Sequence, residues 1–326
     1  TVAMNGYFPG DGTTVLFPLY PLLMRLIGRY LLSGNYLLAG IFVSNIAYFF
    51  ALFYLYKLTE LEFNPRVAIS TVIYLSVFPT AFLFLSAYTE SLFLLCAVSS
   101  FYYARGGKWL VASIMGLLAA LTKPFGLLLF FPLLYEYMVE REFKISAIRC
   151  DVLFLFLIPM GALAFLLYRH LCVGDALLIT ETYRTGWGVH ASWSWNNIFD
   201  SLMAIFDTER FPPLSLEDTL VRRIFYNSFD LAYVGLFVLL SLVSLHRLRL
   251  TYSLYMFSVL FVVLSLNFRP PYPIIAVPRY VLVLFPGFMV LGSVVRNRVL
   301  HWGTVYFWAM LLSLFTAMFV TWRMVA

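Results

Sequence analysis

The segment from Val67 to Phe125, VAISTVIYLSVFPTAFLFLSAYTESLFLLCAVSSFYYARGGKWLVASIMGLLAALTKPF, decides the fold. It contains three apolar stretches joined by two short connectors. Its charged residues stand at the ends of those stretches, as expected where an unpaired charge in the middle of a bilayer is costly. If the stretches alternate across a membrane, Glu90 and Lys123 emerge on the same side, and the connector with Arg105 and Lys108 lies on the other.

The composition indicates a membrane protein with several spans. Of the 326 residues, 62% are hydrophobic and only 12% are charged, whereas about 25% of the residues of a soluble domain are charged. The formal net charge is +6, but the basic residues are scattered through short connectors, so we expect no nucleic-acid partner. We predict an all-α polytopic membrane protein.

Ten apolar stretches are predicted to be membrane spans. They cover roughly residues 37–57, 67–85, 91–103, 109–121, 125–139, 152–171, 231–245, 252–266, 280–295 and 302–321. The basic residues of the connectors then fall on one side, which the positive-inside rule makes cytoplasmic. They are Arg66, Arg105, Lys108, Arg141, Lys144, Arg149, Arg247, Arg249, Arg296 and Arg298.

The chain is expected to form one transmembrane domain, 1–326, with two external parts. Residues 1–36 form an external segment in which the stretch Val15–Leu32 places Arg25 and Arg29 on one helical face. A helix of that kind lies along a membrane surface more often than it crosses it. The second part, the loop 172–229, carries aromatic side chains that suit either an interface where lipid or sugar is handled or an ordinary aromatic belt. They include Trp187, Trp193 and Trp195.

No motif of a soluble enzyme is present. The chain has no GxxxxGK[ST] loop, HExxH pair, CxxC pair or GxSxG elbow, and its four histidines have no ligand spacing, so we expect neither a metal nor a cofactor. Acids, cations and tyrosines gather instead on the predicted outer side. The candidates are Asp11, Tyr20, Tyr88, Glu90, Lys123, Tyr183, Arg184, His190, Arg269 and Arg279.

Two interpretations of these residues stay open. In the structural interpretation, Glu90 interacts favourably with the dipole of the helix that it begins, and Lys123 and Arg279 extend to the membrane–water interface. Asp11 and Arg184 are then ordinary loop residues. In the functional one, Lys123, Arg184, Arg269 and Arg279 bind the phosphate of a polyprenyl phosphate, whose tail lies in the bilayer. A nearby carboxylate then acts as general base for an acceptor hydroxyl. That combination favours sugar transfer from a lipid carrier.

Four segments resemble the GPI mannosyltransferase 2 (PIG-V) family and its prokaryotic relatives. They are FPLYPLLMRLIG at Phe17–Gly28, SVFPTAFLFLSAYTESLFLL at Ser76–Leu95, GLLAALTKPFGLLLFFPLLYEY at Gly116–Tyr137 and PRYVLVLFPGF at Pro278–Phe288. The resemblance implies a GT-C membrane fold and an inverting transferase that uses a polyprenyl-phosphate sugar, typically dolichol-phosphate mannose, on the non-cytoplasmic face. It further implies that Tyr20, Tyr88, Glu90 and the pair Arg279–Tyr280 belong to the site, and Lys123 stands where relatives usually have arginine.

The sequence differs from this family at its N-terminal end. Family members carry a first span and then a Trp-Asp stretch whose aspartate is the expected base, and this chain begins at a point that resembles the Gly-Tyr after it, Gly6-Tyr7. Asp11 is the only acid in this segment and is held as a substitute, so the predicted catalytic residues are Asp11 and Glu90. If the chain is a fragment, we expect the full protein to have eleven spans.

Two other functions stay open beside a lipid-dependent transferase. One is a lipid or glycolipid transporter or flippase, although the sequence shows neither internal repeats nor charges in the middle of its spans. The other is a noncatalytic membrane subunit, which the missing aspartate favours. The sequence leaves undetermined the sugar, the acceptor (lipid-linked, glycan or protein) and the membrane, with a prokaryotic plasma membrane and an endoplasmic reticulum membrane fitting equally well.

Overall fold

The computed structural model describes residues 2–7, 15–173, 188–207, 220–268 and 272–321. The first half contains α1 Val2–Asn5, α2 Leu19–Tyr30, α3 Tyr36–Glu62, α4 Pro65–Val77, η2 Ala81–Phe84, α5 Glu90–Arg105, α6 Trp109–Ala120, η3 Pro124–Leu129, α7 Phe130–Glu140, η4 Ile145–Ala147, η5 Cys150–Phe156 and α8 Leu157–Val173. The second half contains β1 His190–Ala191, α10 Ser194–Phe206, α11 Leu220–Arg247, α12 Leu250–Leu264, β2 Leu266–Asn267, α13 Val277–Tyr280, η6 Val281–Val283, α14 Phe285–Val294 and α15 Arg298–Val320.

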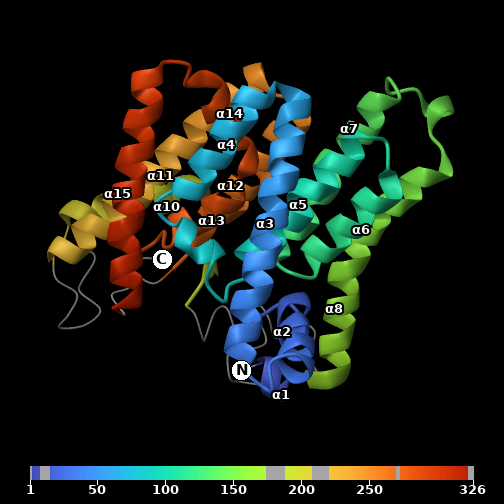
Figure 1. Ribbon diagram of the computed structural model, residues 1–326, viewed down its shortest axis with the longest axis horizontal. Helices are drawn as coiled ribbons and strands as arrows, with labels where there is room; N and C mark the ends of the chain where they lie inside the picture. Colours follow the sequence, from blue (N-terminus) through green and yellow to red (C-terminus); the bar gives the residue numbers. More distant parts are fainter. Residues whose placement is uncertain (1, 8–14, 174–187, 208–219, 269–271, 322–326) are drawn as a thin grey trace.

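The described part of the chain is mainly a bundle of helices, as predicted (Figure 1). The two strands are two residues each and pair antiparallel, with His190 opposite Asn267 and Ala191 opposite Leu266. Several helices begin at an asparagine whose side chain accepts a backbone N–H of the first turn. Asn35 caps α3 through Leu38 N at 3.0 Å, and Asn64 caps α4 through Val67 N at 3.0 Å, with Pro65 at the first helical position. Such caps satisfy N–H groups that have no partner within the helix.

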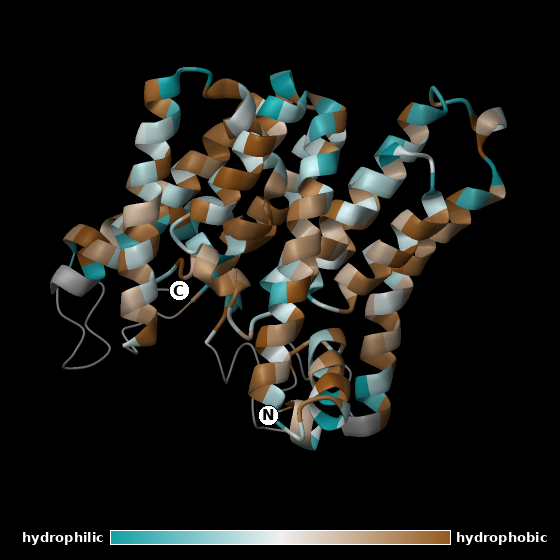
Figure 2. Cartoon of the chain, viewed as in Figure 1, coloured by the Kyte–Doolittle hydropathy of each residue, from teal (hydrophilic) through white to brown (hydrophobic). Residues whose placement is uncertain are grey.

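Four helices of the described residues are long and apolar enough to cross a membrane. They are Tyr36–Glu62, Cys150–Leu171, Arg223–Arg247 and Arg298–Val320, and a fifth is counted if the pair Val277–Val283 and Phe285–Val294, bent by 80°, forms one span. Each of the ten predicted spans contains helix, but several are short or are divided by 3₁₀ turns. The total of about ten spans therefore stays a prediction. Figure 2 shows that apolar residues dominate the middle of the bundle and polar ones its upper edge.

The external segments differ in detail from their predicted bounds. The helix predicted over Val15–Leu32 is shorter, Leu19–Tyr30, with Arg25 and Arg29 exposed and Tyr20 and Gly28 buried. The predicted loop 172–229 includes the helix α10 and the first turns of α11. Of its three tryptophans, Trp193 and Trp195 are exposed and their rings stack at 4.8 Å. Trp187 lies outside the described residues.

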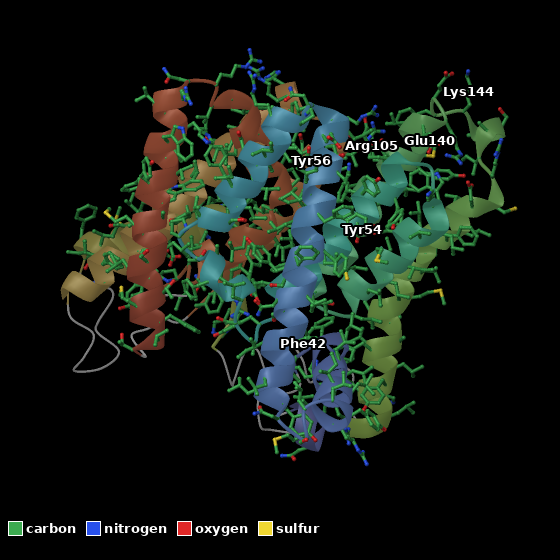
Figure 3. All side chains as sticks on the ribbon, viewed as in Figure 1. Phe42, Tyr54, Tyr56, Arg105, Glu140 and Lys144 are labelled. Carbon is green, nitrogen blue, oxygen red and sulfur yellow. The ribbon has the colours of Figure 1, made fainter. Side chains whose placement is uncertain are left out.

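Charged residues cluster at the end of the bundle where α3 and α5 finish. Arg105 lies 2.5 Å from Glu62 and 3.2 Å from Glu136, and Arg249 lies 3.4 Å from Glu136. Figure 3 shows Arg105, Glu140 and Lys144 toward this same end and Phe42 toward the other. The ion pairs join α3, α5 and α7 to the start of α12. That this end is cytoplasmic stays a prediction.

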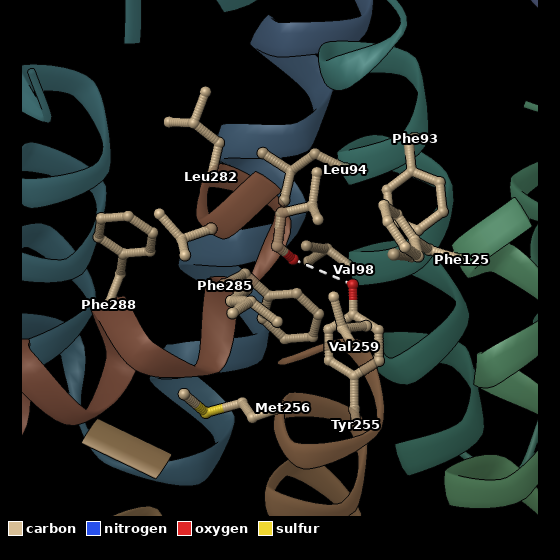
Figure 4. Packing of buried hydrophobic residues seen from close by; sticks show 14 of the residues in the cluster. Phe93, Leu94, Val98, Phe125, Tyr255, Met256, Val259, Leu282, Phe285 and Phe288 are labelled. Carbon is tan, nitrogen blue, oxygen red and sulfur yellow. Dashed lines mark hydrogen bonds between the residues drawn. The ribbon is translucent and has the colours of Figure 1, made fainter. Parts of the chain in front are cut away.

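Aromatic rings fill the space between α5, α12 and α14. Phe101 lies within 5.5 Å, centroid to centroid, of the rings of Tyr252, Tyr255 and Phe285. The hydroxyl of Tyr255 donates to the backbone oxygen of Val283 at 3.0 Å, where the chain bends between η6 and α14 (Figure 4). Because a buried hydroxyl without a partner is costly, this bond fixes the bend next to the core.

Candidate functional site

Glu90 is the first residue of α5 and is completely buried. The start of the helix is held by its neighbour Ser91, whose hydroxyl donates to the backbone oxygen of Phe84 at 2.6 Å. Arg105, at the other end of α5, lies about 22 Å away along the axis at 1.5 Å per residue. Glu90 and the charged cluster of Arg105 are therefore at opposite ends of the same helix.

Lys123 reaches Glu90 from the turn after α6. Pro124 follows it and starts η3, and Lys123 itself is extended, with φ −151° and ψ 152°, as expected for a residue before proline. Its Nζ donates to Oε1 of Glu90 at 2.8 Å, and only 9% of its side chain is exposed. Burial lowers the pKa of the Lys123 ammonium, and the charge of Glu90 opposes that shift.

Arg279 reaches the same oxygen from the short helix α13. Its Nε donates to Oε1 of Glu90 at 2.5 Å, and its Cζ lies 4.8 Å from the centre of the Tyr88 ring. The side chain is 29% exposed. Within the described part of the chain, the two Nη atoms of Arg279 donate to no protein acceptor, so the guanidinium keeps donors for another group.

The charges of Glu90, Lys123 and Arg279 do not sum to zero. Two cations share one carboxylate oxygen, which leaves one positive charge here among the residues that the structure describes. The second oxygen of Glu90, Oε2, is buried and has no hydrogen-bond partner within the described ranges. An arginine next to a lysine, partly exposed and already oriented by a carboxylate, is an arrangement suited to binding a phosphate.

The tyrosines of the predicted site surround these charges. The hydroxyl of Tyr20 donates to the backbone oxygen of Gly40 at 2.9 Å and lies 2.8 Å from Ser44 Oγ, which in turn donates to the backbone oxygen of Tyr88 at 3.0 Å. Helix α2 is thereby connected to α3 and to the turn before Glu90. Tyr280 packs its ring edge-on against Phe125, two residues after Lys123, at 5.8 Å.

The structure thus brings together six of the eleven candidate residues named from the sequence. Glu90, Lys123, Arg279 and Tyr88 are in direct contact, while Tyr20 and Tyr280 join them through Ser44 and Phe125. Of the other five, Asp11, Tyr183, Arg184 and Arg269 lie outside the described residues, and His190 lies in β1, opposite Asn267. Among the described His, Cys, Asp and Glu residues, no group of three or more is placed to hold a metal ion. The expectation that no metal and no cofactor takes part stays a prediction.

Sequence reasoning missed two buried residues that support α13. Oδ1 of Asp230 accepts the backbone N–H of Val277 at 3.0 Å, and the hydroxyl of Thr80 donates to the backbone oxygen of Pro278 at 2.8 Å. Asp230 is 4% exposed and Thr80 is completely buried. The signal for Asp230 was present in the sequence, because an acid inside an apolar helix is a candidate functional residue by default.

Comparison with known proteins gives one informative structural match. No protein family matches the chain, and no curated protein matches it. Among solved structures, the chain is similar to ArnT from Cupriavidus metallidurans bound to undecaprenyl phosphate, with a TM-score of 0.56 and 12% sequence identity. ArnT is a GT-C glycosyltransferase. This chain shares the fold of that structure.

The similarity to ArnT extends over most of this chain but not over most of ArnT. It covers 90% of the chain and 52% of the ArnT chain, so this chain spans about half the length of its neighbour. At this identity the match concerns the fold. The fold of this chain is therefore shared with a GT-C structure, whereas the assignment of the chain to the GT-C superfamily, and to the PIG-V family within it, stays a prediction.

Proposed function

We propose that the protein is a membrane glycosyltransferase that moves a hexose from a polyprenyl-phosphate donor to an acceptor on the non-cytoplasmic face. The observation that carries this proposal is the meeting of Glu90, Lys123 and Arg279, from three separate segments, at one end of α5. A GT-C neighbour bound to undecaprenyl phosphate supports the class of donor. The choice of mannose as the hexose rests on the resemblance to the PIG-V family.

Arg279 and Lys123 are the proposed ligands of the donor phosphate. In the transfer, a hydroxyl oxygen of the acceptor bonds to the anomeric carbon of the sugar while the bond from that carbon to the phosphate oxygen breaks. The polyprenyl phosphate leaves with the electron pair, and fixed cations stabilise the charge that develops on it. A base removes the proton of the acceptor hydroxyl.

Glu90 is better suited to holding the cations than to removing that proton. Its Oε1 already accepts from Lys123 and Arg279, and both cations reduce the basicity of the carboxylate. We therefore assign it the role of orienting Arg279 and Lys123. The catalytic role predicted for Glu90 and for Asp11 stays a prediction, and Asp11 is the proposed base in this scheme.

Two measurements on the purified protein in detergent test the proposal. The first is binding of undecaprenyl phosphate, for the wild type, for Arg279→Gln and for Lys144→Gln. Lys144 is a matched control, because it is an exposed cation at the opposite end of the bundle. We expect Arg279→Gln to weaken binding at least tenfold and Lys144→Gln to leave it unchanged. Equal binding by all three proteins would exclude Arg279 as a phosphate ligand.

The second measurement is transfer of radiolabelled sugar from polyprenyl-phosphate mannose to a membrane-lipid extract, with this chain and with a chain extended at its N-terminus. Transfer that depends on Arg279 supports the glycosyltransferase. Donor binding without transfer by either chain would instead favour a transporter or a noncatalytic subunit.

A further inference from the structure

The short helix α13 carries Arg279 but has few means of holding its own position. It consists of four residues, Val277–Tyr280, and follows Ala276, which has a left-handed backbone conformation with φ 62° and supplies no side-chain cap. Its second residue is Pro278, which has no N–H to donate. A helix of one turn gains little from its own hydrogen bonds. Its orientation must therefore come from contacts with other segments.

Two side chains from distant parts of the sequence supply these contacts. Asp230, in α11, accepts the N–H of Val277 at 3.0 Å, which is the bond that an N-cap residue ordinarily makes within its own helix. Thr80, after α4, donates to the carbonyl of Pro278 at 2.8 Å. The backbone groups of the two residues that precede Arg279 are thus bound by α11 on one hand and by the turn after α4 on the other.

An aspartate is an unexpected residue at position 230 if its role is only to accept a backbone hydrogen bond. It is 4% exposed, lies in one of the apolar candidate spans and forms no ion pair with any residue that the structure describes. A carboxylate in such surroundings is unfavourable unless its hydrogen bonds compensate for burial. Asparagine offers the same acceptor oxygen without the charge. The structure shows one favourable interaction of Asp230, the hydrogen bond to Val277, and this bond helps to fix the position of α13.

We propose that Asp230 and Thr80 are positioning residues that hold Arg279 where its Nε meets Glu90 and its Nη atoms remain available to a phosphate. The proposal deepens the proposed function and rests on it for the identity of that phosphate. The geometric part, that Arg279 depends on Asp230 and Thr80, stands on the hydrogen bonds alone. Loss of either side chain frees one of the two backbone groups that fix α13 and lets the guanidinium leave Glu90.

The test measures the chemical reactivity of Arg279 separately from lipid binding. The purified protein is treated with phenylglyoxal, which modifies accessible guanidinium groups, and the modification of Arg279 is followed by peptide mass spectrometry. The variants are Asp230→Leu, Asp230→Asn and Thr80→Val. Ser241→Ala is the matched control, because Ser241 is a buried polar residue of α11, eleven residues after Asp230, whose hydroxyl donates to the backbone oxygen of Phe237 in the same helix.

We expect Asp230→Leu and Thr80→Val to raise the modification rate of Arg279 at least threefold, and Asp230→Asn and Ser241→Ala to leave it at the wild-type value. The same proteins are assayed for undecaprenyl phosphate binding, where the first two lose affinity about tenfold and the Asn variant retains it. Rescue by asparagine separates loss of the hydrogen bond from general damage to α11. If Asp230→Leu fails to fold, Thr80→Val, which keeps the shape of the side chain, gives the same comparison.

The possible failures are distinguishable. An unchanged rate of Arg279 modification in a folded Asp230→Leu or Thr80→Val variant would overturn the positioning role. A threefold rise in Asp230→Asn would show that the charge of Asp230, and not its acceptor oxygen, matters, and would also overturn it. If the wild type binds no undecaprenyl phosphate while the reactivity pattern appears as expected, the proposed function fails and the positioning of Arg279 stands.

Discussion

Replacing Glu90 by glutamine should destabilise the fold strongly, because it removes the carboxylate that Lys123 and Arg279 both contact. Glu90 is completely buried and the Lys123 side chain is only 9% exposed, so their ion pair is a buried one. Removing one partner of a buried pair costs about 3–5 kcal/mol, since the other charge is left uncompensated. Arg279 is 29% exposed and adds less, because water reaches it.

The assay is thermal unfolding in detergent, with Glu140→Gln as the control. Glu140 also pairs with an arginine, Arg141, and accepts from the indole N–H of Trp109, but its side chain is 46% exposed, and a pair that water reaches contributes about 0–1 kcal/mol. A double-mutant cycle with Lys123→Met isolates the interaction, and we expect a coupling energy of about 0.5–3 kcal/mol between the two sites. A coupling of zero, or equal midpoints for Glu90→Gln and Glu140→Gln, would refute the reasoning.

The same variant should show a characteristic dependence on pH. Burial already holds the pKa of Lys123 below its ordinary value of 10.5, and Glu90 opposes that effect in the wild type. In Glu90→Gln the pKa falls further. Between the folded-state pKa and 10.5 the unfolded chain binds a proton that the folded protein has released, so stability rises with pH through this window. The difference in unfolding free energy between the wild type and Glu90→Gln should therefore become smaller as pH approaches 10. Thermal unfolding of both proteins across a pH series measures this difference.

Three further predictions concern other parts of the molecule. Glu136→Gln should lower the unfolding temperature without weakening undecaprenyl phosphate binding, since Glu136 joins α7 to α5 and α12 at the opposite end; reduced binding would contradict a purely structural role. Arg279→Lys should keep the positive charge but bind undecaprenyl phosphate roughly tenfold more weakly, because an ammonium lacks the planar set of donors; wild-type affinity in a titration would contradict this. Gly126→Ala should destabilise the fold by about 1–3 kcal/mol, because its Cβ would overlap the backbone of Ala119 and Ala120. Gly235→Ala has open space and should be neutral or stabilising, and thermal unfolding of both variants compares them.

Much of the fold was predictable from the sequence, because the start of a helix depends on the residues next to it along the chain. The helices α3, α5 and α6 begin within one residue of the predicted span starts, at Tyr36, Glu90 and Trp109, where a cap, a charge or a connector interrupts the apolar run. The spans of η3–α7 and η6–α14 were predicted as continuous helices. The first is broken at Phe130, two residues before Pro132, and the second at Phe285, directly before Pro286; a proline inside a helix removes a hydrogen bond.

The candidate site was predictable only in part. Glu90, Lys123 and Arg279 stood out as charges at span ends, and an even number of crossings between them was enough to place them on one side. The role of Asp230 was not apparent, because its partner is a backbone N–H of Val277, 47 residues away. Backbone groups are the same at every position, so the sequence does not mark which of them a side chain will meet.

Composition, the ten apolar stretches and the positions of the charges between them predicted on their own a helical membrane protein with its basic connectors at one end and Glu90, Lys123 and Arg279 at the other. Only the tertiary structure decided that the two cations share a single oxygen of Glu90, across separations of 33 and 189 residues, and that α13 is held by Asp230 and Thr80. The physical reason is one of range. The transfer of an apolar segment into the membrane and the capping of a helix depend on that segment alone. Hydrogen bonds of 3 Å or less between distant segments also require the correct packing angles of the helices, and these angles depend on every contact in the core.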